Sequence, residues 1–190
     1  MRKIGFVRHY EVMHKPVGKW MTAAQFNDWV EQYDKAELRT LKPDVGGIEW
    51  EVCFSSHLSR ATRTADSIFK GKIILSEQLR EIGIHAVSAR TRIKLPLSLW
   101  LILARLAWYV SHRSQEEGKV QTISRARRFI ESIERDYGAS NVLIVSHGAF
   151  IKVLAKELRL RGYKGKTGII PKNGRLYAFM KRQTKNDRSE

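Results

Sequence analysis

Short apolar runs typical of β-strands alternate along this chain with longer segments that have helical periodicity. The expected strands are Ile4–Val7, Trp50–Phe54, Lys72–Leu75, Val142–Val145 and Leu176–Met180. Such alternation is typical of α/β domains, in which helices connect parallel strands and cover the sheet. The pattern predicts a single three-layer α/β/α domain with a mostly parallel sheet over residues 1–180. We expect the polar tail, residues 181–190, to be frayed.

The segments between the strands have the spacing of amphipathic helices. Thr22 and Gln25 match a capping box, in which two side chains bond free backbone amides at a helix N-terminus. Phe26, Trp29 and Tyr33 follow on one face, which predicts a helix whose apolar side packs into the core. Similar spacing predicts further helices over residues 58–69, 120–137 and 150–158.

The most apolar part of the chain is Leu95–Val110. A membrane-spanning helix needs about 20 apolar residues. This segment is shorter, with Pro96 near its start and Arg105 inside it. A buried or site-covering helix is therefore the preferred interpretation. A helix that lies on an anionic membrane is the alternative, because basic residues precede the segment.

The charge of the chain is strongly positive. Its 190 residues include 35 Lys and Arg and 19 Asp and Glu, a formal net charge of +16. Such an excess attracts anions such as phosphorylated metabolites, nucleic acid or acidic lipid headgroups. The single cysteine, Cys53, excludes an intramolecular disulfide and a multi-cysteine zinc site, and we expect a buried, inert thiol. The first apolar run is too short for a signal peptide, so we expect a cytoplasmic protein.

Chemically active side chains follow four of the predicted strands. Arg8 and His9 follow the first strand, Arg60 begins the helix after the second, Glu81 comes after the third, and His147 follows the fourth. Ligands of open α/β sheets bind beyond the carboxyl ends of the strands. We therefore expect these five side chains to lie close together at one edge of the sheet.

This combination of side chains suits a phosphoryl group. Arginine binds phosphate oxygens through two N–H groups and stays charged, and helix N-termini offer free backbone amides. A neutral imidazole is able to attack phosphorus and form a covalent intermediate, while a carboxyl group protonates the departing oxygen. Guanidinium groups neutralise the developing charge, so this chemistry does not require a metal.

Four segments resemble the motifs of a known family. FVRHYE, around His9, resembles the RHG motif of the histidine phosphatase superfamily, the phosphoglycerate-mutase-like proteins. SSHLSRATRTAD, LREIG and VLIVSHGAFI resemble its SSxLxRAxxTA segment, the segment with its acid, and its second-histidine motif. The resemblance runs from residue 4 to about residue 180. KWMTAAQFNDWVEQYD and the apolar segment around Trp100 look like features of a small bacterial-type subgroup.

The resemblance implies a role for each of the five residues. His9 would be the nucleophile that accepts the phosphoryl group, and Arg8, Arg60 and His147 would bind its oxygens. Glu81 would be the general acid and later the base for water. The implied reaction is hydrolysis of a small phosphomonoester through a phosphohistidine, without a metal or organic cofactor.

Two positions depart from the family's motifs. Tyr10 stands where the family has glycine, and its side chain either crowds the mouth of the pocket or turns away. His57 replaces the usual proline and either contacts substrate or sits on the surface. We take both as candidate substrate-binding residues, and Tyr10 puts the size of the substrate and the activity itself in question.

Several assignments have competitors. Glu11 or Glu77 could serve instead of Glu81, and Arg63 shares a helix face with Arg60. Ser55 and Ser56, which precede a helix, are more typical of capping residues than of nucleophiles.

The preferred function is a phosphatase in which residues 82–118 form a lid or wall over the site and select the substrate. One alternative is a phosphomutase of the phosphoglycerate type. Another is a noncatalytic module that binds phosphoryl ligands or an acidic membrane surface, for which Tyr10 and the net charge of +16 argue.

Metal and nucleic-acid sites have little support in the sequence. The six histidines form neither HxH nor HExxH, so we expect no metal site. No helix-turn-helix, zinc-finger or RNA-binding signature is present, and only charge points to nucleic acid. We expect Arg125, Arg127 and Arg128 to form a solvated face. The sequence indicates no particular oligomeric state.

Overall fold

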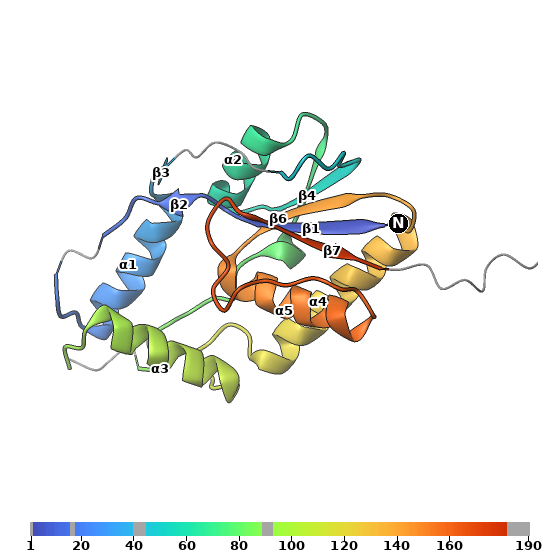
Figure 1. Cartoon of the computed structure of the whole chain (residues 1–190). Coiled ribbons are helices and arrows are strands. Elements are labelled where there is room, and N and C mark those ends of the chain that lie inside the picture. The colour runs from blue at the N-terminus through green and yellow to red at the C-terminus, as the bar shows by residue number, and fades with distance from the viewer. Residues whose placement is uncertain (1, 16–17, 40–44, 89–92, 182–190) are drawn as a thin grey trace, which may run out of the picture.

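The central feature of the computed structural model is a five-stranded sheet with the order β5–β4–β6–β1–β7 (Figure 1). The structure describes residues 2–15, 18–39, 45–88 and 93–181. Four neighbouring strands are parallel, and β7 pairs antiparallel with β1 at one edge. The strands are β1 (Lys3–Arg8), β4 (Val52–Ser56), β5 (Ile73–Ser76), β6 (Val142–Ser146) and β7 (Leu176–Met180). All five expected strands are present, and the predicted α/β fold with a mostly parallel sheet is confirmed.

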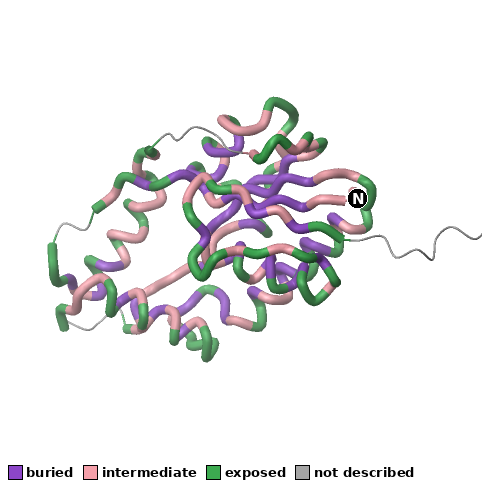
Figure 2. The backbone as a smooth tube through the Cα atoms, in the orientation of Figure 1, coloured by how far each residue is buried: buried purple, intermediate pink, exposed green. Residues whose placement is uncertain are grey.

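Helices cover both faces of the sheet. The helix α2 (Ser59–Ile68) packs on one face, while α4 (Lys119–Asp136) and α5 (Gly148–Leu160) pack on the other. Strand β1 shows why both faces are apolar: Ile4 and Phe6 join the α4–α5 side, and Val7 joins the α2 side. Successive side chains of a strand point to opposite faces, so a strand buried on both faces must be apolar throughout. Figure 2 shows the resulting buried strands at the centre of the molecule.

Two further helices lie beyond the carboxyl ends of the parallel strands (Figure 1). The predicted capping box of Thr22 and Gln25 starts α1 (Ala23–Lys35), and α3 (Leu97–Tyr109) packs against it. Phe26 stacks on Trp100 with ring centroids 5.6 Å apart. The Trp100 indole N–H donates to the Met21 carbonyl at 2.8 Å. The helix predicted within the apolar segment is therefore present, and its contacts attach it to α1.

Three short elements were not predicted. The strands β2 (Glu11–Val12) and β3 (Leu38–Arg39) form an antiparallel pair beside α1, and the 3₁₀ helix η1 (Glu77–Leu79) follows β5. Elements of two or three residues are too short to show a hydrophobic period. Within the described residues, no helix is both long and apolar enough to cross a membrane. The tail expected to fray falls, from residue 182 onward, outside the described residues.

Candidate active site

The two predicted histidines meet at the carboxyl edge of the sheet. β1 and β6 are parallel neighbours with Arg8 opposite Ser146, so His9 and His147 leave the sheet side by side. Their ring centroids are 5.2 Å apart, and both residues are almost fully buried. Residues separated by more than a hundred positions thus form one site, as the carboxyl-edge rule predicts.

The backbone around His9 determines which of its ring nitrogens is free. The Nδ1 atom lies 2.6 Å from the Tyr10 carbonyl oxygen. A carbonyl only accepts hydrogen bonds, so Nδ1 carries the proton in the neutral ring and the lone pair is on Nε2. The side-chain amide of Asn173, before β7, donates to the His9 carbonyl at 2.7 Å. This arrangement leaves the lone pair of Nε2 free of the backbone.

The structure distinguishes the two candidate arginines of α2. Arg60 is buried and Arg63 is exposed. The Arg60 guanidinium forms an ion pair with Asp34, at the end of α1. Arg60 also lies close enough to His9 and His147 to influence their titration. Arg60, rather than Arg63, therefore lies beside the two histidines.

Three buried nitrogen atoms of the site lack a hydrogen-bond partner in the described structure: Arg8 Nε, Arg60 Nε and His147 Nδ1. One Nη of Arg8 donates to the Pro171 carbonyl at 2.9 Å. A Cβ at Gly148 would lie 3.1 Å from Arg8 Nε, so the glycine allows the guanidinium to pack against the start of α5. Buried polar atoms without partners are rare in folded proteins and are explained here if the site takes an anion.

Glu81 is the candidate carboxylate that reaches the site. Its oxygens accept from the backbone amides of Phe150 at 3.2 Å and Ala149 at 3.5 Å, in the first turn of α5. His147 is the N-cap residue of the same helix. Glu11 instead pairs with Arg39 at 3.2 Å in the β2–β3 pair, and Glu77 is exposed in η1. Position thus favours Glu81 over both competitors.

A buried arginine fixes the segment before Glu81. Arg125 of α4 forms a buried ion pair with Glu117. It also donates to the carbonyls of Gln78 at 2.7 Å and Arg80 at 3.0 Å. The expectation of a solvated face is therefore wrong for Arg125, because four acceptor oxygens compensate its burial. Arg127 and Arg128 are exposed as expected.

Both histidines are uncharged at neutral pH in the free protein. Burial, reinforced by the charge of Arg60, lowers the pKa of His9 to about 3 and that of His147 well below its ordinary value. His147 Nε2 lies 2.9 Å from the Ser56 hydroxyl oxygen. Ser56 also accepts from the Leu58 amide at 3.3 Å, but Leu58 is the N-cap residue of α2 and no side chain caps that helix, so the expectation that Ser55 and Ser56 are capping residues is wrong. A neutral His9 is the form that is able to attack phosphorus.

The lowered pKa of His9 predicts that the free energy of unfolding falls in acid. The unfolded chain protonates this imidazole below pH about 6.5, whereas the folded protein resists protonation down to about 3. The free energy of unfolding then has its full value above the pKa of His9 in the unfolded chain. It falls as the pH drops below that pKa, by about 2 kcal/mol between pH 8 and pH 5. Urea unfolding at several pH values measures the effect. The His9→Asn variant should show a shallower fall, and an unchanged slope would contradict the shift.

The structure places Tyr10 away from the anion site. Only 2% of its surface is exposed, and its hydroxyl lies 3.0 Å from the Ser67 hydroxyl, far along α2 from Arg60. Its backbone amide donates to Thr64 at 2.9 Å. Of the two orientations expected for this side chain, the structure shows the one that turns away from the pocket. Tyr10 is therefore a packing residue, and the prediction that it contacts substrate is corrected. His57, in contrast, is exposed and close enough to affect the pKa of His147.

This placement predicts that Tyr10→Phe affects stability and leaves catalysis unchanged. The change removes the hydroxyl pair with Ser67 and should lower the free energy of unfolding by about 1 kcal/mol. The ring stays, so the phosphoryl site keeps its shape. Urea unfolding and aryl phosphate hydrolysis measure the two effects, with Ser67→Ala as the matched control that removes the same pair. A large change in KM would place the phenol in the substrate site after all.

Helix α1 contributes two site residues that the sequence did not reveal. The Arg60 guanidinium lies 5.7 Å from the Tyr33 ring centroid, and Asp34 is its ion-pair partner. Burial raises the pKa of Tyr33, while the charges of Arg8 and Arg60 oppose that rise. Tyr33 also contacts Trp29, one turn earlier, with ring centroids 5.5 Å apart. Its apolar spacing identified it only as a core residue.

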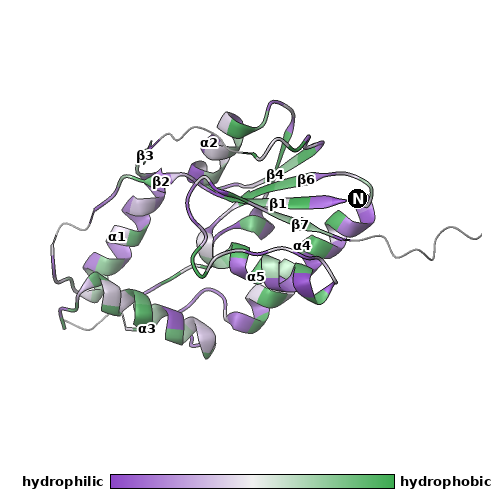
Figure 3. Cartoon of the chain, viewed as in Figure 1, coloured by the Kyte–Doolittle hydropathy of each residue, from purple (hydrophilic) through white to green (hydrophobic). Residues whose placement is uncertain are grey.

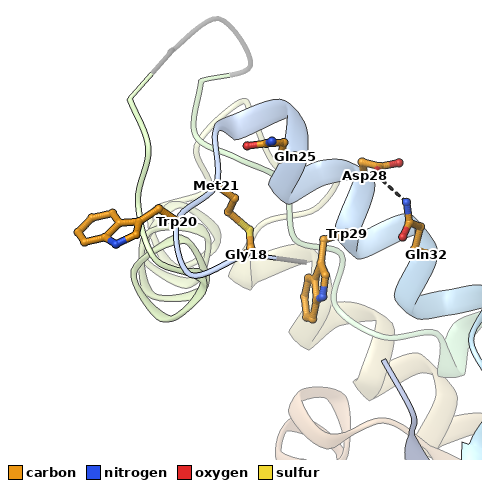
Figure 4. Close-up of a pocket in the computed structure, with 7 residues that line it drawn as sticks. All are labelled: Gly18, Trp20, Met21, Gln25, Asp28, Trp29 and Gln32. Carbon is orange, nitrogen blue, oxygen red and sulfur yellow. Dashed lines mark hydrogen bonds between the residues drawn. The ribbon is translucent and has the colours of Figure 1, made fainter. Parts of the chain in front are cut away.

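A separate hollow runs along the exposed side of α1 (Figure 4). Trp29 and Met21 form its apolar part, and the Gln32 amide donates to Asp28 at 2.7 Å beside it. The remaining lining residues are Gly18, Trp20, Gln25, Asp28 and Gln32. None of the sequence-predicted site residues lines this hollow. Among the described residues, no group of three or more His, Cys, Asp or Glu side chains is placed to hold a metal ion.

Comparison with known families identifies the fold's relatives. The family model of the histidine phosphatase superfamily (branch 1) matches residues 30–179. The chain belongs to this superfamily. Membership confirms the family indicated by the motifs and, at the level of the family, the expectation of a phosphatase. The match begins at residue 30, so His9 and Tyr10, the residue that stands in place of the family's glycine, lie outside the matched range.

Solved structures with the same fold include several phosphatases. The α-ribazole phosphatase of Shigella flexneri has a TM-score of 0.58 and 17% identity, covering 95% of this chain and 91% of its own. A mycobacterial glucosyl-3-phosphoglycerate phosphatase in complex with VO3 has a TM-score of 0.59 and 19% identity, with coverage of 94% and 92%. The phosphoserine phosphatase of Entamoeba histolytica, with 3-phosphoglyceric acid, has a TM-score of 0.54 and 18% identity, with coverage of 95% and 91%. No curated protein matches the chain.

Proposed function

We propose that this histidine phosphatase family member hydrolyses a small phosphomonoester through a phosphohistidine on His9. One observation carries the proposal: two neutral imidazoles and two guanidinium groups share a buried site in which three nitrogen atoms lack partners. A phosphoryl group offers oxygen acceptors for these nitrogens and a negative charge for the two arginines. The three similar structures are named as phosphatases of small phosphorylated compounds, which supports this class of substrate.

In the first step, His9 Nε2 attacks the phosphorus. The bond from Nε2 to phosphorus forms while the bond from phosphorus to the alcohol oxygen breaks. The Tyr10 carbonyl, 2.6 Å from Nδ1, holds the ring in the required tautomer and orientation. Arg8, Arg60 and His147 bind the phosphoryl oxygens, and the charge that develops on these oxygens strengthens their contacts with the arginines.

Glu81 acts on the alcohol oxygen in the same step. Its carboxyl group gives a proton to the departing oxygen, so the products are a neutral alcohol and phosphohistidine. In the second step Glu81 takes a proton from water, the water oxygen attacks phosphorus, and the nitrogen–phosphorus bond breaks. Inorganic phosphate leaves, and His9 is neutral again. The amides of Ala149 and Phe150 and the anchored segment before Glu81 support this position of the carboxyl group.

The decisive experiment is an assay of phosphate release from an aryl phosphate and a panel of small phosphomonoesters, with vanadate as inhibitor. Release of phosphate that vanadate inhibits supports the proposal. Interconversion of phosphoglycerate isomers without net release would identify a phosphomutase instead. Vanadate binding without turnover of any substrate would identify a noncatalytic phosphoryl-binding module.

A further inference from the structure

Helix α3 is apolar except for Ser98 and Arg105, yet only one side of it is covered. Trp100, Ala104 and Ala107 are buried on the side that faces the rest of the molecule. The other side exposes Leu99, Ile102, Leu106, Tyr109 and the C-cap residue Val110, each to between 37% and 70%. Their spacing of mainly three and four residues places them in one row, which we call the α3 stripe. A helix that is almost entirely apolar is normally buried, so we expect another surface to bind the α3 stripe.

Apolar side chains at both ends lengthen the α3 stripe. Trp20, which is 58% exposed, precedes Met21, and Met21 forms a β-bridge with Leu95 just before the helix. Figure 4 shows the Trp20 indole extending away from the other labelled side chains. At the opposite end, the Lys119 amino group lies 3.8 Å from the Tyr109 ring centroid and is followed by the exposed Val120. Figures 1 and 3 show α3, with its apolar residues, at the edge of the molecule.

The stretch of chain that contains the α3 stripe is basic. Residues 82–115 contain no Asp or Glu but include Lys94, Arg105 and Arg113. In the described structure neither Lys94 nor Arg113, both of which are exposed, forms an ion pair with a carboxylate, whereas one Nη of Arg105 is buried in the protein. Arg161, by comparison, pairs with three glutamates. The surface at α3 therefore combines an apolar row with uncompensated cations.

We propose that the α3 stripe docks on an anionic lipid surface, with the helix parallel to the membrane plane. Apolar side chains enter the boundary between headgroups and acyl chains, while basic side chains beside them bind lipid phosphates. The 13 residues of α3 rise about 20 Å, less than the roughly 30 Å of the hydrocarbon core, so the helix lies on the membrane instead of crossing it.

Charge favours lipid over a second copy of the chain as the cover. A two-fold dimer places the same surface patch of each subunit against the other. Such a dimer through the α3 stripe would bring the exposed Lys94 and Arg113 close to their counterparts in a molecule of net charge +16. An anionic bilayer provides both the apolar layer and the opposite charge.

Docking would also orient the active site. Helix α3 packs on α1, and α1 supplies Tyr33 and Asp34 beside Arg60. Both helices lie beyond the carboxyl ends of the strands (Figure 1). A membrane under α3 would therefore face the same end of the molecule as the phosphoryl site.

Vesicle co-sedimentation of the full chain tests the proposal. The probes are phosphatidylcholine vesicles with and without phosphatidylglycerol, at low and high salt. We expect binding only with phosphatidylglycerol, weakened by salt. The double variant Ile102→Gln, Leu106→Gln should bind at least about tenfold more weakly because it loses apolar burial. Its matched control is Leu160→Gln, Ile169→Gln, which changes two apolar side chains elsewhere that are even more exposed and should bind as the wild type does.

A second pair of variants separates local charge from net charge. Lys94→Gln with Arg113→Gln should weaken binding about fivefold for each charge removed near the surface. Lys152→Gln with Lys156→Gln removes the same charge from exposed positions of α5 and should have a smaller effect. Circular dichroism during urea unfolding checks that each variant is folded, independently of any enzymatic activity.

Three results would overturn the proposal. The wild type would fail to bind vesicles that contain phosphatidylglycerol. The Ile102→Gln, Leu106→Gln variant would bind as well as the wild type, which would attribute binding to net charge alone. Sedimentation equilibrium would show a dimer that this variant converts to a monomer, without vesicle binding by either, which would make a second copy the cover.

Discussion

The His9→Ala variant is expected to lose aryl phosphate hydrolysis by about 10⁴-fold or more, because it lacks the nitrogen that forms the covalent intermediate. Arg8, Arg60 and His147 remain, so the variant should still bind vanadate or phosphate. Initial rates measure the first effect and isothermal titration measures the second. Loss of turnover with retained anion binding is specific to a nucleophile, whereas a collapsed site would lose both.

The matched control for this change is His57→Ala. His57 is exposed near the site and is not buried between the arginines, so its removal should change the rate far less. Equal rates for the wild type and His9→Ala would exclude His9 from the mechanism. In that case the neutral His9 imidazole beside the two guanidinium groups would have a role other than attack on phosphorus.

The Arg60→Gln variant is expected to lower kcat/KM by about 10³-fold, since a buried cation no longer stabilises the phosphoryl oxygens in the transition state. Arg63→Gln is the matched control, because it removes the same charge from an exposed position on the same helix. Its effect should be small. Similar losses in the two variants would indicate a general effect of charge on the approach of substrate.

Arg60→Gln should also change the pH profile in a defined direction. The charge of Arg60 contributes to lowering the pKa of His9 and of His147. Without it both pKa values rise toward their ordinary value, so protonation inactivates the nucleophile at a higher pH. The acidic limb of the profile of kcat/KM against pH should therefore shift upward in Arg60→Gln and stay in place in Arg63→Gln.

The sequence predicted the parts of the site that depend on strand order. Arg8, His9 and His147 follow buried apolar runs, and parallel strands bring their carboxyl ends to the same edge. The motif resemblance then distinguished Arg60 from Arg63, although both share a helix face. Only the structure supplied the reason, which is the burial of Arg60 beside the two imidazoles.

The remaining features depend on tertiary contacts that no local pattern records. Tyr33 has the spacing of a core residue, yet its ring lies beside Arg60. From the sequence alone Arg125 is expected to be a surface charge, whereas in the structure Glu117 and two backbone carbonyls surround its guanidinium group. Tyr10 departs from the family motif, and only its contact with Ser67 shows which way the side chain points. In each case a distant segment of chain determines the outcome.

The segment before β7 makes the site depend on a contact between distant parts of the chain. Pro171 and Asn173 hold Arg8 and the His9 carbonyl, and the Gly174 amide donates to the Arg8 carbonyl at 2.8 Å. The first two of these hydrogen bonds join residues 163 and 164 positions apart. A chain in which the segment before β7 has not yet folded against β1 therefore holds neither the Arg8 guanidinium nor the His9 backbone in place.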